Sequence, residues 1–94
     1  MTKEIDLKSL IRVSQKYKLL ANPITAKIIR LLLENEPLNV QSIEKHISLS
    51  QPTTSHYLSM MRYMGFVKSD KSGRMIFYSL NKEHIETLLS FVGK

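Results

Sequence analysis

The stretch that decides the fold is LSQPTTSHYLSMMRYMGFV, residues 49–67. Ser50 is a residue type that caps helix starts, because its hydroxyl accepts a hydrogen bond from a free amide of the first turn. Pro52 suits that first turn, where a missing N–H costs nothing. Gly65 fits the left-handed position that commonly follows a helix. The stretch therefore predicts a helix that begins after Ser50, ends before Gly65 and is followed by a strand.

The predicted helix has one apolar face and one polar face. Its apolar positions recur every three or four residues, as expected for a face that enters a core: Thr54, Leu58 and Met61, with Tyr57 and Met64 beside them. The opposite stripe holds short hydrogen-bonding side chains and one arginine, without any acid: Gln51, Ser55, Ser59 and Arg62, flanked by Thr53 and His56. Such groups suit base edges and phosphate oxygens. The stripe predicts a DNA-recognition helix; the alternative is an ordinary amphipathic helix with a polar side.

A second helix is predicted just before this one. Residues 41–47, QSIEKHI, place Ile43 and Ile47 four residues apart on one face. Only Ser48 and Leu49 then separate this helix from the next helix start. Two helices joined so closely predict a helix-turn-helix, whose second helix enters the major groove of DNA.

A β-hairpin is predicted after Gly65. Two β-rich runs, FVKSD at 66–70 and RMIFYSL at 74–80, flank Lys71-Ser72-Gly73. A helix-turn-helix followed directly by a hairpin is a winged helix. The hairpin carries Lys68, Lys71 and Arg74 against Asp70, so we expect Arg74 to reach a phosphate or the minor groove. A solvated basic turn is the alternative for each of these cations.

The chain resembles the ArsR-type (ArsR/SmtB-like) winged helix-turn-helix transcriptional regulators over nearly its whole length. The resemblance is carried by LLANPITAKIIRLLL at 19–33, ENEPLNVQSIEKHISLSQPTTSHYLSMMRYMGFV at 34–67 and SGRMIFYSL at 72–80. It implies a mainly α fold of about five helices with a small β-hairpin wing. Three positions depart from the family pattern: Thr25 replaces a common arginine, Thr54 a common valine, and Tyr57 a common histidine or leucine. The last two changes bear on which bases are read.

Length, composition and charge fit a small regulator. The chain has 94 residues, 43% of them apolar, which predicts a single folded domain over residues 1–94. It has no cysteine, which excludes disulfides and thiol chemistry. No apolar run approaches the roughly 18 residues that span a bilayer, and residues 1–9 lack the apolar core of a signal peptide, so a cytoplasmic protein without a membrane partner is expected.

The net charge of +6 favours an anionic partner. It is concentrated in residues 1–30, which hold seven bases and two acids. Residues 31–94 hold seven bases and six acids, so the net charge does not single out the recognition helix.

The two ends of the chain, residues 1–21 and 81–94, are predicted to be dimerisation helices. Asp6 is placed to cap a helix that runs to Ala21, Asn22 and Pro23 begin the next helix, and Asn81 begins the last. The positions assigned to the dimer interface are mostly apolar: Leu7, Leu10, Ile11, Ser14, Tyr17, Ile85, Leu88, Leu89 and Val92. The alternative is that both helices close the domain's own core.

The resemblance favours pairing of the first and last helices across a two-fold axis. Two recognition helices would then meet successive major grooves, roughly 34 Å apart, on a near-palindromic operator.

A repressor that responds to a metal ion is one alternative function. Relatives use either a cysteine pair, which this chain lacks, or ligands on the last helix. His84 matches one such position, but Lys82 stands where the resemblance requires an aspartate, and a protonated lysine does not coordinate zinc. His84 with Glu83 or Glu86 is the remaining metal candidate, so no cofactor is predicted and the effector is not identified.

We therefore predict a sequence-specific DNA-binding transcriptional regulator, a dimeric repressor whose partners are double-stranded DNA and a second copy of itself. A winged-helix protein-interaction module without DNA binding is the remaining alternative. No enzyme is predicted, because the chain has no paired carboxylates, glycine-rich phosphate loop or nucleophile–base grouping. The residues assigned to DNA are Ser50, Gln51, Thr53, Thr54, Ser55, His56, Ser59 and Arg62, with Lys45 before them and Lys71 and Arg74 on the wing.

Overall fold

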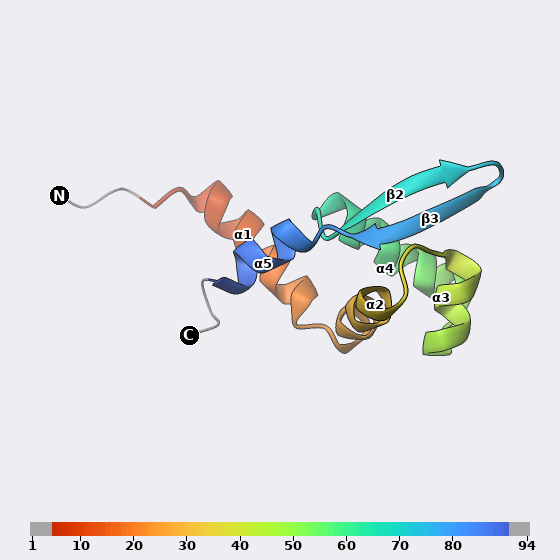
Figure 1. The fold of residues 1–94 in the computed structure, drawn as a ribbon. Helices are drawn as coiled ribbons and strands as arrows, with labels where there is room; N and C mark the ends of the chain where they lie inside the picture. The colour runs from red at the N-terminus through yellow and green to blue at the C-terminus, as the bar shows by residue number, and fades with distance from the viewer. Residues whose placement is uncertain (1–4, 91–94) are drawn as a thin grey trace.

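A computed structural model describes residues 5–90 of the chain (Figure 1). Its helices are α1 (Leu7–Leu20), α2 (Pro23–Glu34), α3 (Val40–Ile47), α4 (Gln51–Tyr63) and α5 (Lys82–Ser90). Its strands are β1 (Leu38–Asn39), β2 (Val67–Ser72) and β3 (Met75–Leu80). The described part of the chain thus confirms the predicted winged helix-turn-helix, with five helices and a small antiparallel sheet.

The predicted helix starts are confirmed by their capping hydrogen bonds. Asp6 Oδ1 accepts from the Lys8 amide (3.1 Å), and Asn22 Oδ1 accepts from the Ile24 amide (2.8 Å). Ser50 Oγ accepts from the Thr53 amide at 3.4 Å and so caps α4. Helix α3 begins one residue earlier than predicted, because Asn39 supplies a cap that the sequence prediction missed. Its Oδ1 accepts from the Ser42 amide at 2.9 Å.

Helix α4 ends at Tyr63, just before the glycine that the sequence analysis singled out. Gly65 has φ +86°, and its amide donates to the carbonyl of Arg62 (3.0 Å). The next amide, of Phe66, donates to the carbonyl of Met61 (2.8 Å). This pair of bonds satisfies carbonyls that the helix end leaves free. It also turns the chain so that Phe66 enters the core directly after the helix, with none of its side chain exposed.

The sheet has the order β1-β3-β2, with β3 paired antiparallel to both neighbours. The hairpin turn is tighter than predicted, because Lys71 and Ser72 pair with Ile76 and Met75 and leave two residues, Gly73 and Arg74, in the turn. Gly73 supplies φ +62° there. Strand β1 was missed by the sequence prediction. It pairs with the middle of β3, Leu38 opposite Tyr78, and so ties the wing to the start of α3.

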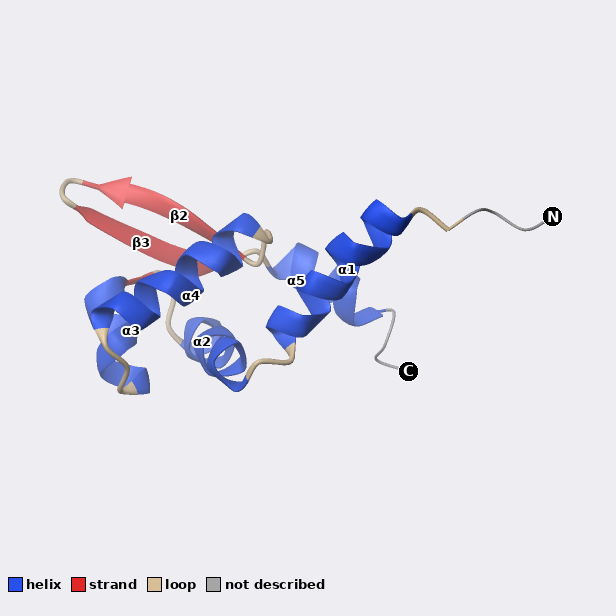
Figure 2. Cartoon of the chain, turned by 180° about the vertical axis from the view of Figure 1, so that it is seen from behind, coloured by secondary structure: helices blue, strands red, loops and turns tan. Residues whose placement is uncertain are grey.

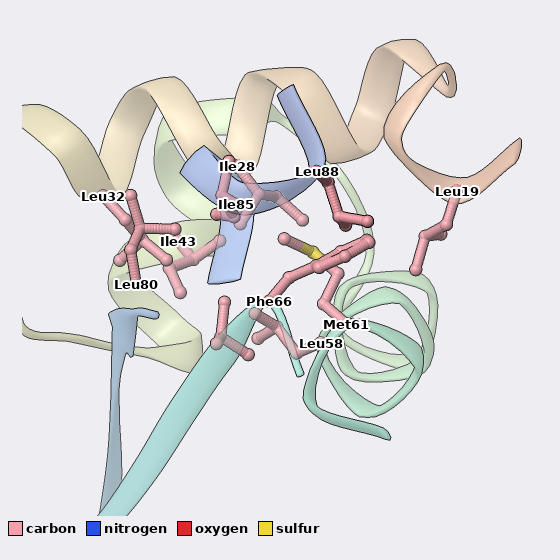
Figure 3. Packing of buried hydrophobic residues seen from close by; sticks show 11 residues of the cluster. Leu19, Ile28, Leu32, Ile43, Leu58, Met61, Phe66, Leu80, Ile85 and Leu88 are labelled. Carbon is pink, nitrogen blue, oxygen red and sulfur yellow. The ribbon is translucent and has the colours of Figure 1, made fainter. Parts of the chain in front are cut away.

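The core lies where α2, α4 and α5 meet the base of the wing (Figure 3). Figure 3 shows Phe66 between Met61 of α4 and the α5 side chains Ile85 and Leu88. The buried apolar residues come from every helix: Leu19, Ile28, Leu32, Ile43, Leu58, Met61, Phe66, Val67, Leu80, Ile85 and Leu88. Each large side chain of this kind contributes about 1.5–3 kcal/mol when fully buried.

Two residues assigned to the dimer interface belong to this core instead. Ile85 and Leu88 are each 8% exposed, so they have little surface left for a partner. Tyr17, a third assigned residue, is half-buried, and its hydroxyl donates to the carbonyl of Leu88 at 2.7 Å. These side chains hold α1 and α5 together within the chain, as the alternative interpretation of the terminal helices expected. No helix in residues 5–90 has the length and apolar character needed to cross a bilayer.

Candidate nucleic-acid interface

Helices α3 and α4 form the helix-turn-helix, joined by residues 48–50. Ser48 adopts the left-handed conformation (φ 56°), and the Leu49 amide donates to the carbonyl of Glu44 at 3.4 Å. This short connection reverses the chain between the two helices, and Figure 2 shows α3 lying beside the first half of α4. Three residues thus connect the two helices of the helix-turn-helix.

The polar stripe of α4 lies on the surface. Gln51, His56, Ser59 and Arg62 are exposed, whereas Thr53 and Ser55 are half-buried. Ser50 is exposed too, but its Oγ accepts from the Thr53 amide and donates to Thr53 Oγ1 (3.0 Å). The side chains available at the start of α4 are therefore uncharged donors and acceptors.

Thr54 was assigned both to the apolar face and to DNA, and the structure corrects the second assignment. None of its side chain is exposed. Its hydroxyl donates to the carbonyl of Ser50 at 2.9 Å. With its one donor used inside the domain, Thr54 has no polar group to offer a base.

Arg62 lies between the recognition helix and the wing. Its Nη1 donates to Ser69 Oγ of β2 at 3.4 Å, and within residues 5–90 no carboxylate oxygen lies within 4.0 Å of its guanidinium nitrogens. The guanidinium carries five N–H donors, so this one bond leaves others free for a phosphate. Ser69 was missed by the sequence prediction, because only the folded hairpin brings it to Arg62.

The wing cations separate onto different faces of the hairpin. Side chains alternate along a strand, so Lys71 shares a face with Ser69, the residue that Arg62 contacts. Lys68 shares the opposite face with Asp70, and Asp70 lines a hollow there with Glu36 and Pro37. Arg74 is exposed in the turn at the tip of the wing. Lys71 is therefore the wing cation on the face that Arg62 contacts, and Arg74 is the cation at the wing tip.

Lys45 is exposed on α3, the helix before the recognition helix. The neighbouring His46 is tied to its own helix, since its Nδ1 lies 2.7 Å from the carbonyl oxygen of Ser42. Lys45 thus offers a positive charge beside the turn between the two helices.

His84 packs inside the domain. Its ring lies against Phe66, with the ring centroids 5.8 Å apart, and its Nε2 is buried without a hydrogen-bond partner. A Cβ at Gly65 would lie 3.3 Å from this ring. Among residues 5–90, no three His, Cys, Asp or Glu side chains gather closely enough to hold a metal ion.

Some of the residues assigned to the dimer interface are exposed, and these lie mainly on α1. Leu7 is 67% exposed and Leu10 is 53% exposed, and Ile11 is exposed beside them. Ser14 is exposed, with its hydroxyl donating to the carbonyl of Ile11, and Leu89 is the exposed apolar position on α5. Val92 lies outside the described residues.

Comparison with known proteins finds the same motif and fold. Residues 22–69 match a family model described as "Bacterial regulatory protein, arsR family". The HTH-type transcriptional regulator NmtR of Mycobacterium tuberculosis is 34% identical to the chain, over 90% of this chain and 70% of that protein. The crystal structure of the transcriptional repressor PagR of Bacillus anthracis is 30% identical, with a TM-score of 0.71 over 93% of this chain and 99% of that one.

A second solved structure is described as homodimeric. The winged helix-turn-helix DNA-binding domain of Mb0332 from Mycobacterium bovis is 25% identical to this chain, with a TM-score of 0.77. The match covers 99% of this chain and 87% of that one.

Proposed function

The chain belongs to the arsR family of bacterial regulatory proteins, and we propose that it is a sequence-specific DNA-binding transcriptional repressor that acts as a homodimer. The observation that carries the proposal is the exposed, acid-free stripe of α4 inside a helix-turn-helix. Among its relatives, PagR is named as a transcriptional repressor and the Mb0332 domain as a homodimeric DNA-binding domain, which supports the same function here.

The proposed recognition step uses the first half of α4. Gln51 is exposed at the first position of the helix and can pair with the donor and acceptor groups of a base edge. Thr53, Ser55 and His56 follow within reach of the same groove. The free amides at the start of α4 also favour a phosphate, since a helix N-terminus carries partial positive charge.

The proposed phosphate contacts surround this helix. Lys45 lies before it, Arg62 at its end, and Lys71 on the wing face that Arg62 approaches. Arg74 at the wing tip is proposed to enter the minor groove or bind its phosphates. These contacts hold the recognition helix in register but do not themselves identify bases.

The proposed dimer pairs the exposed apolar face of α1, with the end of α5, across a two-fold axis. Leu7, Leu10 and Leu89 provide exposed apolar surface that pairing would remove from water. Two α4 helices would then reach successive major grooves, roughly 34 Å apart, and the operator would be close to palindromic. Repression would follow where such an operator overlaps a promoter.

A competition titration tests this function. The purified protein is titrated against a labelled duplex from its own promoter region, with either the same unlabelled duplex or a scrambled duplex of equal length as competitor. We expect the promoter duplex to compete at concentrations at least a thousand-fold below the scrambled one, the lower end of the usual specificity ratio. Equal competition by both duplexes would contradict sequence-specific binding.

A further inference from the structure

A basic groove lies between α1 and the end of α4, outside the helix-turn-helix. We call it the α1–α4 groove. It is lined by three cations of α1 and by apolar or aromatic groups from both helices: Lys8, Arg12, Lys16, Ile11, Tyr63 and Met64. The positive charge of residues 1–30 lies outside the recognition helix α4, and this groove holds three of those cations.

The three cations form one ridge along α1. Lys8, Arg12 and Lys16 are spaced four residues apart, which places them within an arc of roughly 80° around the helix. No carboxylate of residues 5–90 lies within ion-pairing distance of any of them. Like charges at this spacing destabilise a helix, and a polyanion bound along the ridge would relieve that repulsion.

The ridge lies on a different side of α1 from the proposed dimer face. With about 100° per residue, Arg12 is rotated roughly 140° from Leu7 and 160° from Leu10. Leu19, which enters the core, lies only about 20° from Arg12 around the same helix. Pairing through Leu7 and Leu10 would therefore cover Ile11 at the edge of the α1–α4 groove but leave its three cations uncovered.

The groove continues the surface that is proposed to face DNA. Tyr63 is the last residue of α4 and is 86% exposed, four residues after the exposed Ser59. Tyr63 lies at the opposite end of α4 from Gln51, where it lines the groove together with α1. A duplex that follows the exposed side of α4 would pass from the recognition stripe into the groove.

We infer that the α1–α4 groove binds the phosphate backbone of the operator between its two half-sites. The inference rests on the proposed function, because both grooves would meet at the operator centre only in the proposed two-fold pairing of the α1 helices. Lys8, Arg12 and Lys16 supply the positive charges, and Tyr63 supplies an exposed hydroxyl and a ring face for the sugar. An acidic protein segment fits the charges alone, but continuity with α4 favours the duplex.

The test compares the salt dependence of operator binding for two variants of the full chain. Arg12→Gln with Lys16→Gln removes two cations from each groove, four in a dimer. Each phosphate contact contributes about 0.9 to the slope of log affinity against log salt, so the slope should fall by about 3 to 4 units. The matched control, Lys18→Gln with Lys27→Gln, removes the same charge from exposed positions of α1 and α2 outside the groove and should change the slope by less than one unit. Phosphate ethylation at the operator centre should weaken wild-type and control binding, but not binding of the groove variant.

Each outcome is decisive. An unchanged slope and unchanged central ethylation pattern in the groove variant would overturn the inference and leave the acidic segment as the better occupant. Arg12→Lys with Lys16→Arg keeps the charge and should keep the wild-type slope, so a loss of slope in this swap would also count against it. If the wild-type protein did not prefer its operator over other duplexes, the proposed function itself would be overturned. That result differs from one in which the operator is preferred but the groove variant binds like the wild type.

Discussion

The side-chain amide of Asn22 donates a hydrogen bond to the hydroxyl oxygen of Tyr57, with 3.1 Å between Nδ2 and Oη. The same side chain caps α2 through its Oδ1, which accepts from the Ile24 amide. One residue therefore caps the start of α2 and contacts the inner side of α4. Tyr57 is also a position where the chain departs from the family pattern, and its hydroxyl is used inside the domain.

Tyr57→Phe should lower the free energy of unfolding by about 1 kcal/mol, because it removes the acceptor of the Asn22 amide but keeps the ring. Sequence preference for DNA should not change, since the hydroxyl faces α2. Chemical denaturation with a binding titration measures both. Tyr78→Phe is the matched control, because the Tyr78 hydroxyl makes no hydrogen bond within the described part of the chain. Equal losses in the two variants would contradict this role of Asn22.

Gly65→Ala should destabilise the fold more than Gly73→Ala. Both glycines have positive φ, and placing alanine there costs about 1–2 kcal/mol. Gly65 has the additional constraint that a new Cβ lies 3.3 Å from the His84 ring, whereas nothing lies within 4 Å at Gly73. Thermal and chemical denaturation of the two variants compares them directly. A Gly73 variant as unstable as the Gly65 variant would show that the contact with His84 is unimportant.

Leu10→Glu should weaken dimerisation and leave the monomer folded, because Leu10 is exposed and lies outside the core. A charge buried at a two-fold interface would face its own copy at close range. Sedimentation equilibrium should show a shift to monomer, and circular dichroism should show the helices retained. Met75→Glu places the same charge on the wing, where Met75 is exposed, and should leave the oligomeric state unchanged. Retention of the dimer in Leu10→Glu would remove α1 from the proposed interface.

Acid should weaken the start of α1. The hydrogen bond from the Ser9 hydroxyl, with smaller contributions that include the Arg12 charge, lowers the pKa of Asp6 below its ordinary value of 3.8. A lowered pKa contributes stability that is present above pH 3.8 and is lost as the pH falls through the folded-state pKa. Asp6→Asn keeps a good cap but does not titrate there. The stability difference between the two proteins should therefore change below pH 4, and a difference constant down to pH 2 would be contrary to this assignment.

The sequence predicted the elements whose signals are local. Capping residues, helical periodicity and Gly65 predicted the positions of α1, α2, α4 and α5. The alternation around Gly73 predicted the hairpin. Strand β1 was missed because a strand of two residues has no periodicity, and only its pairing with β3 defines it.

The candidate site was predicted in part, for a similar reason. The polar stripe of α4 follows from helical spacing, and its side chains do lie on the surface, apart from Thr54. The contact of Arg62 with Ser69 and the division of the wing cations between two faces depend on the folded hairpin. Whether Ile85 and Leu88 face a partner or their own core also depends on packing, since both arrangements use the same apolar spacing.

The central claim is that the exposed side of α4 reads the bases of a duplex, and Gln51 is its sharpest test. Random duplexes bound by wild-type protein and by Gln51→Ala would be selected and sequenced in parallel. We predict that preference relaxes at one position of each half-site, by about 1–3 kcal/mol, while the other positions keep theirs. Identical selected sequences with identical preferences would contradict the claim.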